Sequence, residues 1–324
     1  MKYGLSYRSY ARPFRRPLIT AHGVWSVREG IVIELRSSSQ FGVGSGEIAP
    51  LPWFGSETQA EALEFCRSWS GTIDDAAIDT IPEHLPACQF AFESARSALR
   101  STRSPRVPPI ESRDPLPICQ LLPAGSACLT AIDTLTPDGS HHRTYKTYKW
   151  KIGTTSMESE LEVLQALLDR LPARSNLRLD ANGGLSLQQA QCWLDMCDRL
   201  NQSSQPDHPQ IEFIEQPLPP SHWSDLVQLS HQFATPIALD ESIATLSQLH
   251  TAHARGWRGI YVIKPAIIGS PQRLRSFCQQ HQLDTVFSSV FETAIGRDAG
   301  LRLAQGLQTR DRAVGYGLED WLMP

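Results

Sequence analysis

The sequence lacks the features that mark several large classes of protein. No apolar run approaches the ~20 residues that a membrane-spanning helix needs, and the N-terminus lacks an apolar signal region. The seven cysteines are odd in number and none belongs to a Cys-x-x-Cys pair, so we expect reduced thiols in a core. Neither sign of charge dominates, because 30 basic and 34 acidic residues give a formal net charge of -4. A small-molecule partner is therefore expected, and neither nucleic acid nor a membrane surface.

A cytoplasmic location is predicted from the first residues of the chain. Arginines at positions 8, 12, 15 and 16 suggest a transit peptide, but Pro13 and Pro17 would break the amphipathic helix that such a peptide forms. The sequence does not distinguish a monomer from a homo-oligomer.

The first part of the chain has the composition of a small α+β domain. With 324 residues, 41% of them hydrophobic, the chain is long enough for one large domain and a smaller one. Predicted strands followed by helices at about 57–69 and 86–100 define a capping domain over residues 1–116. Two segments, 12–25 and 41–55, are expected to be irregular loops.

After the Ser-, Arg- and Pro-rich segment 101–117, short apolar strands alternate with amphipathic helices. Repeats of roughly 25 to 35 residues indicate parallel strands, and seven or eight of them favour a closed barrel, a modified (β/α)7β TIM-type barrel. It would cover residues 117–312, with the last strand and a C-terminal segment in 313–324 that packs back on the cap. A doubly wound open sheet is the alternative, although no Gly-x-Gly-x-x-Gly follows the first strand. Strands are predicted at 118–122, 145–151, 177–179, 211–214, 237–239, 259–263 and 285–287.

Helix starts between these strands have sequence signatures of their own. Thr155-x-x-Glu158 predicts a capping box before a run of leucines that Pro172 closes. Ser186-x-x-Gln189 and Ser270-Pro271 predict two further helix N-termini.

Polar residues stand at the ends of six successive apolar strands. In a barrel of this kind the carboxyl ends of the strands converge on one mouth, where active sites are built. Each residue alone is more often part of a surface salt bridge, but six together are much harder to explain in that way. They are Lys151, Asp180, Glu215, Asp240, Lys264 and Ser288.

Asp180, Glu215 and Asp240 would supply three carboxylates from neighbouring strands. An all-oxygen set without His or Cys suits Mg²⁺, with Mn²⁺ as a possible substitute, and disfavours zinc. Without an ion the three acids would repel one another, and some would stay protonated. Glu241 is predicted either to bind the ion or to hydrogen-bond to one of its ligands.

Lys151 and Lys264 come from strands far apart in the barrel order, so we expect them to face each other across the mouth. Lys149 lies on the same face of its strand as Lys151. A lysine has an ordinary pKa of about 10.4, which nearby positive charge and burial lower. Such an amine can remove a proton from the carbon next to a carboxylate, and an ion bound to that carboxylate stabilises the enediolate that forms.

The motifs around these residues resemble the enolase superfamily, in its muconate-lactonising-enzyme-like branch. Within that branch, other motifs look like the o-succinylbenzoate synthase family, and the likeness covers essentially the whole chain. The superfamily motifs are Lys149-Trp150-Lys151, Asp180-Ala181-Asn182, Ile214-Glu215-Gln216-Pro217, Leu239-Asp240-Glu241-Ser242 and Ile263-Lys264-Pro265. The narrower ones are Arg28-Glu29-Gly30, the run GEIAPLP at 46–52, Arg178-x-Asp180 and Ser288-Ser289-x-x-Glu292.

The resemblance implies a Mg²⁺-dependent hydro-lyase that dehydrates 2-succinyl-6-hydroxycyclohexa-2,4-diene-1-carboxylate to o-succinylbenzoate, in menaquinone or phylloquinone biosynthesis. Lys151 would abstract the α-proton and hand it to the departing hydroxyl, and Lys264 would stabilise the enediolate. The small domain, with its loops, would close over the substrate. The ion's ligands would be Asp180, Glu215 and Asp240, supported by Asn182 and Glu241. The residues implied near the substrate are Lys149, Arg178, Ser288 and Gly317.

Other activities stay open. A dipeptide epimerase, an N-acylamino acid racemase or a cycloisomerase of the same branch would use the same lysine pair and metal, although no Asp-x-Asp occurs between Ala313 and Trp321. Gly183-Gly184 after Asn182 also departs from the bulkier pair expected in the family. A Schiff-base aldolase acting through Lys264 and a non-catalytic barrel are further alternatives.

Overall fold

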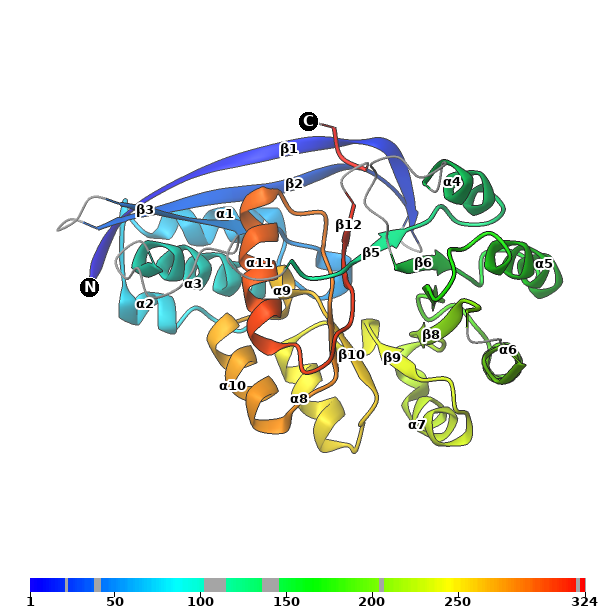
Figure 1. The fold of residues 1–324 in the computed structure, drawn as a ribbon. Helices are drawn as coiled ribbons and strands as arrows, with labels where there is room; N and C mark the ends of the chain where they lie inside the picture. Colours follow the sequence, from blue (N-terminus) through cyan, green and yellow to red (C-terminus); the bar gives the residue numbers. More distant parts are fainter. Residues whose placement is uncertain are drawn as a thin grey trace.

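Two sheets organise the chain (Figure 1). The computed structural model describes residues 1–20, 23–37, 42–101, 115–135, 146–203, 207–318 and 321–323. Within these ranges the first sheet has four strands in the order β3-β2-β1-β4, and the second has eight in the order β11-β10-β9-β8-β7-β6-β5-β12. The predicted linker residues 102–114, the predicted strand start at Tyr145, and Glu319-Asp320 lie outside the described residues.

The first sheet is antiparallel and carries helices on one face. Ile31, Ile33 and Leu35 alternate along β2 and are fully buried, because successive side chains of a strand point to opposite faces. They share an apolar core with Phe90 of α3, and a Cβ on Gly46 would collide with the backbone of that helix. The strands are β1 (Lys2–Thr20), β2 (Gly23–Ser37), β3 (Val43–Ile48) and β4 (Thr72–Asp74), and the helices are η1 (Pro52–Phe54), α1 (Gln59–Ser68), α2 (Asp75–Asp79) and α3 (Pro86–Ser101).

The prediction of an irregular connection over residues 12–25 is wrong. β1 and β2 stay paired through most of this segment, and a register shift between Pro13 and Leu18 accommodates the prolines. Residues 321–323 pair with the other edge of β1: Arg15 N donates to Trp321 O (2.9 Å), and Met323 N donates to Pro13 O (3.1 Å). The loop predicted at 41–55 is likewise wrong in part, because β3 occupies Val43–Ile48 and pairs with β2.

The second sheet confirms the predicted TIM-type barrel. All its recorded strand pairs are parallel, and β12 lies beside β5. A bridge between Ser288 and Gly315 joins the end of β11 to β12, so the ring is nearly closed. The strands are β5 (Ile118–Leu121), β6 (Thr147–Lys151), β7 (Asn176–Asp180), β8 (Gln210–Glu215), β9 (Ile237–Leu239), β10 (Ile260–Ile263), β11 (Thr285–Phe287) and β12 (Val314–Gly317).

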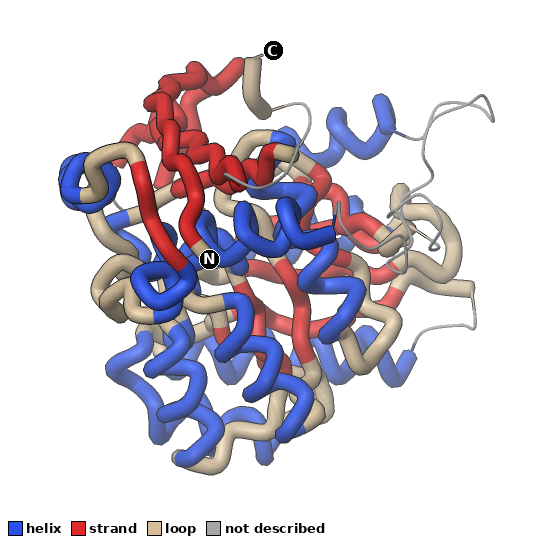
Figure 2. The backbone as a smooth tube through the Cα atoms, turned by 90° about the vertical axis from the view of Figure 1, so that its left-hand side faces the viewer, coloured by secondary structure: helices blue, strands red, loops and turns tan. Residues whose placement is uncertain are grey.

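Helices surround the barrel strands (Figure 2). Ser186 and Gln189 make the reciprocal capping bonds predicted for them, and Ser270 Oγ accepts from Arg273 N as predicted. The capping box predicted at Thr155 is wrong by one residue, because Ser156 is the N-cap of α5. The helices are α4 (Ala127–Leu135), α5 (Met157–Leu168), α6 (Leu187–Ser203), η3 (Pro220–His222), α7 (Trp223–Gln232), η4 (Glu241–Ile243), α8 (Leu246–Ala254), α9 (Pro265–Ile268), α10 (Pro271–His281) and α11 (Ala294–Leu307).

Three apolar clusters of buried side chains lie within the described part of the chain. The largest lies between the barrel strands and their helices, and a small one joins residues of β8 to β11, among them Phe213 and Val262. The cluster of the first sheet extends into the barrel through Ala266, Ile267 and Val290. The two parts of the chain therefore meet across a shared apolar interface, next to the carboxyl ends of β10 and β11.

Candidate active site

The two lysines of β6 point into the barrel. Trp150 between them is fully buried in the cluster that faces the helices, and its Nε1 donates to Gly125 O (3.2 Å). Because side chains alternate along a strand, Lys149 and Lys151 lie on the opposite face. The strand register places Lys151 beside Asp180 of β7.

Carboxylates from three neighbouring strands lie beside these lysines. The register places Asp180 beside Glu215 of β8. Lys149 Nζ lies 2.7 Å from Asp180 Oδ2 and 2.6 Å from Glu215 Oε1, so one ammonium bridges two carboxylates. Asp240, which follows β9, forms an ion pair with Lys264, which follows β10.

Burial makes these charges costly. It raises the pKa of Glu215 to about 7, an effect that Asp180 strengthens and Lys149 opposes. Burial likewise raises the pKa of Asp240 to about 6, against the attraction of Lys264. For Lys149, burial alone would lower the pKa, but Asp180 and Glu215 hold it well above its ordinary value. The site therefore concentrates negative charge that would favour a cation.

Hydrogen bonds from neighbouring polar groups hold the carboxylates and the turns that carry them. Asn182 donates from its backbone N to Asp180 Oδ1 (3.0 Å) and from Nδ2 to Glu241 Oε1 (3.1 Å). Gln216, fully buried, accepts at Oε1 from Asp240 N (3.0 Å) and donates from Nε2 to Ser242 Oγ (2.8 Å). These bonds fix the turns after β7, β8 and β9 relative to one another.

The donor set fits a hard divalent ion. All the candidate ligands are carboxylate oxygens, which Mg²⁺ prefers. Glu241 Oε2 is buried, and it has no hydrogen-bond partner among the described residues. In the ranges that the structure describes, no three acidic, His or Cys side chains are arranged to hold a metal ion, and ammonium groups pair with the oxygens of Asp180, Glu215 and Asp240 instead.

Lys151 and Lys264 lie on opposite sides of the barrel. Their strands, β6 and β10, stand four places apart in the ring of eight. The Lys151 ammonium makes no hydrogen bond or ion pair with the residues the structure describes, whereas Lys264 has two contacts: the ion pair with Asp240 and the ring of Phe54, whose centroid is 4.1 Å from Nζ.

Arg178 does not lie where a substrate contact was predicted. Its Nε donates to Glu212 Oε2 (2.7 Å), its Nη1 donates to Ala313 O (2.8 Å), and its guanidinium carbon stands 4.9 Å from the ring centroid of Phe213. Ala313 precedes β12, so the side chain extends toward the amino ends of the strands. Strand alternation sets the face of a long side chain but not its direction along the barrel, which explains the difference.

Ser288 and Gly317 lie along the seam of the barrel. Ser288 N donates to Ile263 O (2.8 Å), and its hydroxyl would stand 2.7 Å from a Cβ placed on Gly315. A Cβ on Gly317 would collide with the carbonyl oxygen of Cys119 in β5. Both glycines therefore allow backbone segments to approach closely where the ring closes.

Glu47 is a buried carboxylate that the sequence did not single out. It accepts hydrogen bonds from the hydroxyl of Tyr10 in β1, from Thr293 N (2.8 Å) and from Gly296 N (2.9 Å). Glu47 thus caps the N-terminus of α11 from β3, where negative charge is favoured. The only sequence signal was its place in the run 46–52, which does not reveal a partner some 246 residues away.

Aromatic rings join the N-terminal hairpin to the mouth. Trp25 lies 4.8 Å from Phe14, 5.1 Å from Trp53 and 5.5 Å from Phe291, between ring centroids, each in an edge-to-face arrangement. Phe291 belongs to the segment between β11 and α11, so residues of both sheets contribute to this cluster. Edge-to-face rings at these distances attract one another.

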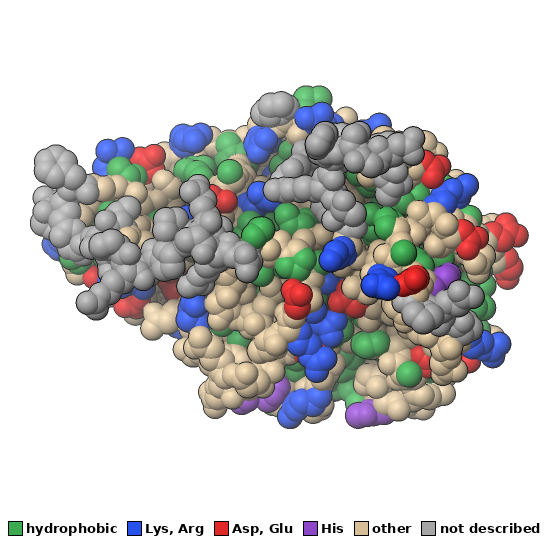
Figure 3. Space-filling view, viewed as in Figure 1, with side chains coloured by type: hydrophobic (Ala, Val, Ile, Leu, Met, Phe, Trp, Pro, Cys, Tyr) green, Lys and Arg blue, Asp and Glu red, His purple; other side chains and the backbone are tan. Residues whose placement is uncertain are grey.

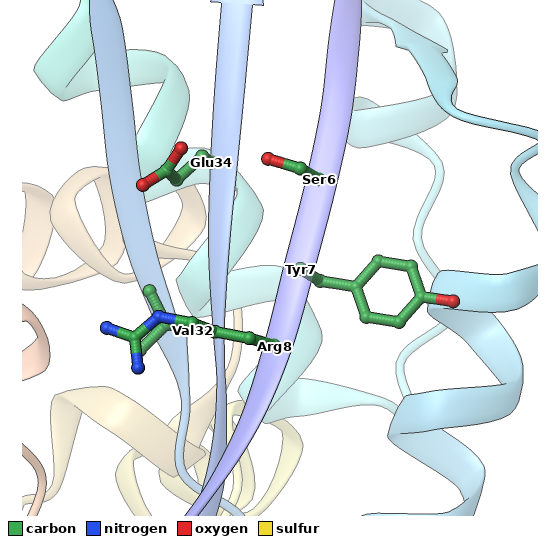
Figure 4. A pocket seen from close by; sticks show the side chains of 5 residues that line it. All are labelled: Ser6, Tyr7, Arg8, Val32 and Glu34. Atoms are coloured by element: carbon green, nitrogen blue, oxygen red, sulfur yellow. The ribbon is translucent and has the colours of Figure 1, made fainter.

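On the face that Figure 3 shows, basic and acidic side chains are interspersed, and several of both signs lie together near its middle. A hollow of about 190 Å³ lies on the first sheet (Figure 4), lined by Ser6, Tyr7, Arg8, Val32 and Glu34. All five come from β1 and β2, and the hollow includes none of the mouth residues. Within the described ranges, no helix combines the length and apolar character needed to cross a bilayer.

Comparison with known protein families gives the class. Residues 138–316 match the family described as "Enolase C-terminal domain-like", and residues 4–99 match "MenC, N-terminal domain". The L-Ala-D/L-Glu epimerase of Bacillus subtilis superposes with a TM-score of 0.76 at 18% identity, over 98% of this chain and 89% of the other, which shows the shared fold alone. The barrel and cap are thus those of the enolase superfamily, as predicted.

Two further comparisons narrow the class. The o-succinylbenzoate synthase of Thermosynechococcus vestitus is 39% identical over 318 residues, covering 97% of this chain and 92% of that protein. A crystal structure described as o-succinylbenzoate synthase from Thermosynechococcus elongatus BP-1, with Mg in the active site, superposes with a TM-score of 0.83 at 38% identity, over 98% and 94% of the two chains. The chain belongs to the o-succinylbenzoate synthase family, a family of lyases.

Proposed function

We propose that this protein dehydrates 2-succinyl-6-hydroxycyclohexa-2,4-diene-1-carboxylate to o-succinylbenzoate. The observation that carries the proposal is the pair of lysines, Lys151 and Lys264, on opposite sides of a row of buried carboxylates. The family membership supplies the substrate. Loss of water from this substrate creates an aromatic ring, so the barrier lies mostly in removing the proton from the carbon that bears the ring carboxylate.

Asp180, Glu215 and Asp240 would hold Mg²⁺, with Mn²⁺ as a substitute. When bound, the ion supplies positive charge that stabilises the negative charge developing on the ring carboxylate. Asn182 and Glu241 would orient the ligands, because Asn182 bonds both Asp180 and Glu241. Ser288, Lys149 and the Gly317 backbone stay proposed substrate contacts, whereas the bonds of Arg178 favour a structural role for it.

Lys151 would act as the base and then as the acid. Its ammonium has no ion pair with the described residues, so its amine can meet the substrate without first breaking a bond. It takes the α-proton, the electron pair of the C–H bond moves into the enediolate, and the hydroxyl on the neighbouring carbon leaves as water with that proton. Lys264 would remain a cation beside the enediolate.

Turnover of the synthetic substrate tests the proposal. Purified protein with Mg²⁺ should form o-succinylbenzoate, and removal of the ion with EDTA should stop the reaction, which Mg²⁺ then restores. The same purified protein should also be assayed for epimerisation of dipeptides and for racemisation of N-acylamino acids. Either of these without dehydration would overturn the proposal, and so would substrate trapped on Lys264 by borohydride, the mark of a Schiff base.

The proposal also includes a role in menaquinone or phylloquinone biosynthesis and a cytoplasmic location, both of which rest on the family and on the expectations drawn from the sequence.

A further inference from the structure

One cap residue contacts a reacting lysine directly. Phe54 belongs to η1 in the N-terminal part of the chain, and its ring centroid lies 4.1 Å from Lys264 Nζ. The lysine side chain is 13% exposed, so the ammonium has little water to solvate it. An ammonium over an aromatic face is attracted by the negative charge of that face, and more strongly where water is excluded.

The segment around Phe54 is braced by its own bonds. Phe54 N donates to Leu51 O (2.9 Å), Gly55 N donates to Pro52 O (3.1 Å), and Leu51 N donates to Ser56 Oγ (2.6 Å). Gly55 ends the turn with φ of 105°, a conformation that suits glycine. The ring of Phe54 is therefore carried by a short turn whose backbone is held by these three hydrogen bonds.

The turn is also held against its surroundings on two sides. Trp53 stacks edge-to-face on Trp25 of β2, with ring centroids 5.1 Å apart. On the other side, a Cβ on Gly55 would stand 3.6 Å from side-chain atoms of Ala244 and Thr245. These two residues follow Asp240 and Glu241 in the chain. The turn that carries Phe54 is therefore held near the carboxyl end of β9 by contacts that do not involve Lys264.

Asp240 and Phe54 hold the ammonium in different ways. Asp240 is a candidate ligand of the metal ion, and a carboxylate that binds an ion has less negative charge to offer Lys264. The ring of Phe54 has no competing role of this kind.

We propose that Phe54 is a positioning residue for Lys264: its ring holds the ammonium at the mouth by a cation–π contact. The kinetic part of this inference rests on the proposed function, while the contact itself does not. The cap then contributes to the chemistry through one defined contact in addition to covering the site.

Graded fluorination of Phe54 tests the contact. Fluorine withdraws charge from the ring face and changes its size little, so mono-, di- and trifluorophenylalanine at position 54 should lower kcat step by step while KM changes little. Phe54→Leu should lower kcat roughly 3- to 30-fold, and Phe54→Tyr should retain most of it. The same fluorinated series at Phe92, whose ring packs on Phe65 at 5.5 Å, is the matched control.

Kinetic outcomes separate this role from a substrate contact. A kcat that does not follow the number of fluorines, or equals the wild-type value in Phe54→Leu, would overturn the proposal. A rise in KM with kcat unchanged would also overturn it, since Phe54 would then bind substrate.

A spectroscopic measurement stands apart from turnover. The chain has only five lysines, at 2, 146, 149, 151 and 264, so ¹³Cε labelling of lysine gives few signals. One ε-methylene should be shifted upfield by the ring, and Phe54→Leu and Lys264→Met should each remove that signal's shift. Absence of any such signal would refute the contact even in an active enzyme. Its presence in a protein that fails to dehydrate the substrate would refute the proposed function instead.

Discussion

Buried charged groups are neutralised to different degrees at the two ends of the barrel. At the carboxyl ends, buried carboxylates crowd together, and the pKa values of Glu215 and Asp240 are raised. At the amino ends, Arg312 donates to both oxygens of Asp284, from Nε (2.6 Å) and Nη2 (2.8 Å), and from Nη1 to Glu212 (2.7 Å). Burial alone would lower the pKa of Arg312, but Asp284 raises it.

The difference indicates which end serves stability and which serves chemistry. Planar guanidinium groups bound at two points to carboxylates satisfy the charges they bury. Lysines that share three carboxylates leave an excess of negative charge, which costs stability in the absence of a ligand and would favour a bound cation. Barrels of this type place catalysis at the carboxyl ends and structural contacts at the amino ends.

The sharpest test of this comparison is Lys151→Ala. Loss of the proposed base should lower kcat by about 10⁴-fold, because no other amine replaces it, with a change in the free energy of unfolding below about 1 kcal/mol. Steady-state kinetics and urea unfolding measure the two effects. Lys146→Ala, an exposed position just before β6, is the control and should keep full activity. Residual activity above a tenth of wild type would remove Lys151 from the role of base.

Asp240→Asn should act first on the ion. The substitution keeps the shape of the side chain but removes a charge, and we expect Mg²⁺ affinity to fall at least about 100-fold, since loss of supporting groups alone costs 10- to 100-fold. Isothermal titration calorimetry measures it. Asp225→Asn on α7, a partly exposed partner of His222, should leave the affinity unchanged. Unaltered binding in Asp240→Asn would mean that the ion lies elsewhere.

Arg312→Met should lower stability and leave activity nearly unchanged, which is the opposite of the effect expected for Lys151→Ala. It removes the buried partner of Asp284, whereas Glu212 keeps Arg178, so the free energy of unfolding should fall by about 2–4 kcal/mol while kcat per folded molecule stays near wild type. Arg310→Met is the matched control, because Arg310 pairs with the same Asp284 at 3.3 Å but is 66% exposed, and should cost less than about 1 kcal/mol. Equal losses in the two variants would contradict the assignment of the amino end to stability.

The smallest expected effect concerns a paired charge of the cap, Asp75. Burial would raise its pKa, but hydrogen bonds from the Met1 ammonium and the Tyr3 hydroxyl (2.8 Å each), with the charge of Arg100, lower it to about 2 from an ordinary 3.8. A carboxyl group whose pKa is lower in the folded than in the unfolded protein stabilises the fold. This stabilisation is present in full above the unfolded pKa of 3.8 and is lost as the pH falls through 3.8 toward 2.

Asp75→Asn measures this contribution. Urea unfolding at pH 6 should show a loss of about 1–2 kcal/mol relative to wild type, and the gap should shrink when the pair is compared at pH 3. Asp195→Asn, at a half-exposed i,i+4 pair, should show little change at either pH. A gap that is independent of pH would show that the carboxylate charge is not what Asp75 contributes.

Errors in the sequence-based predictions share one cause. The composition of residues 12–25 predicts a loop, yet most of the segment is strand that pairs within the β1–β2 hairpin and, at Phe14, with Leu322. Thr155 and Ser156 are both good N-caps, and in the structure Ser156 takes the role, with its Oγ accepting from Ser159 N (3.3 Å). In both cases the local sequence allows two structures, and only the folded protein shows which of them forms.

The sequence by itself determined the order of the barrel strands and which residues end them. Asp180, Glu215 and Asp240 each follow an apolar run directly, and parallel strands bring such ends to one mouth, so periodicity and sequence order suffice. Only the tertiary structure decided that Arg178 extends toward the other end, that Glu47 caps α11, and that Phe54 lies over Lys264. These are contacts between side chains far apart in the chain, and their partners are set by how the two sheets pack, which no local pattern records.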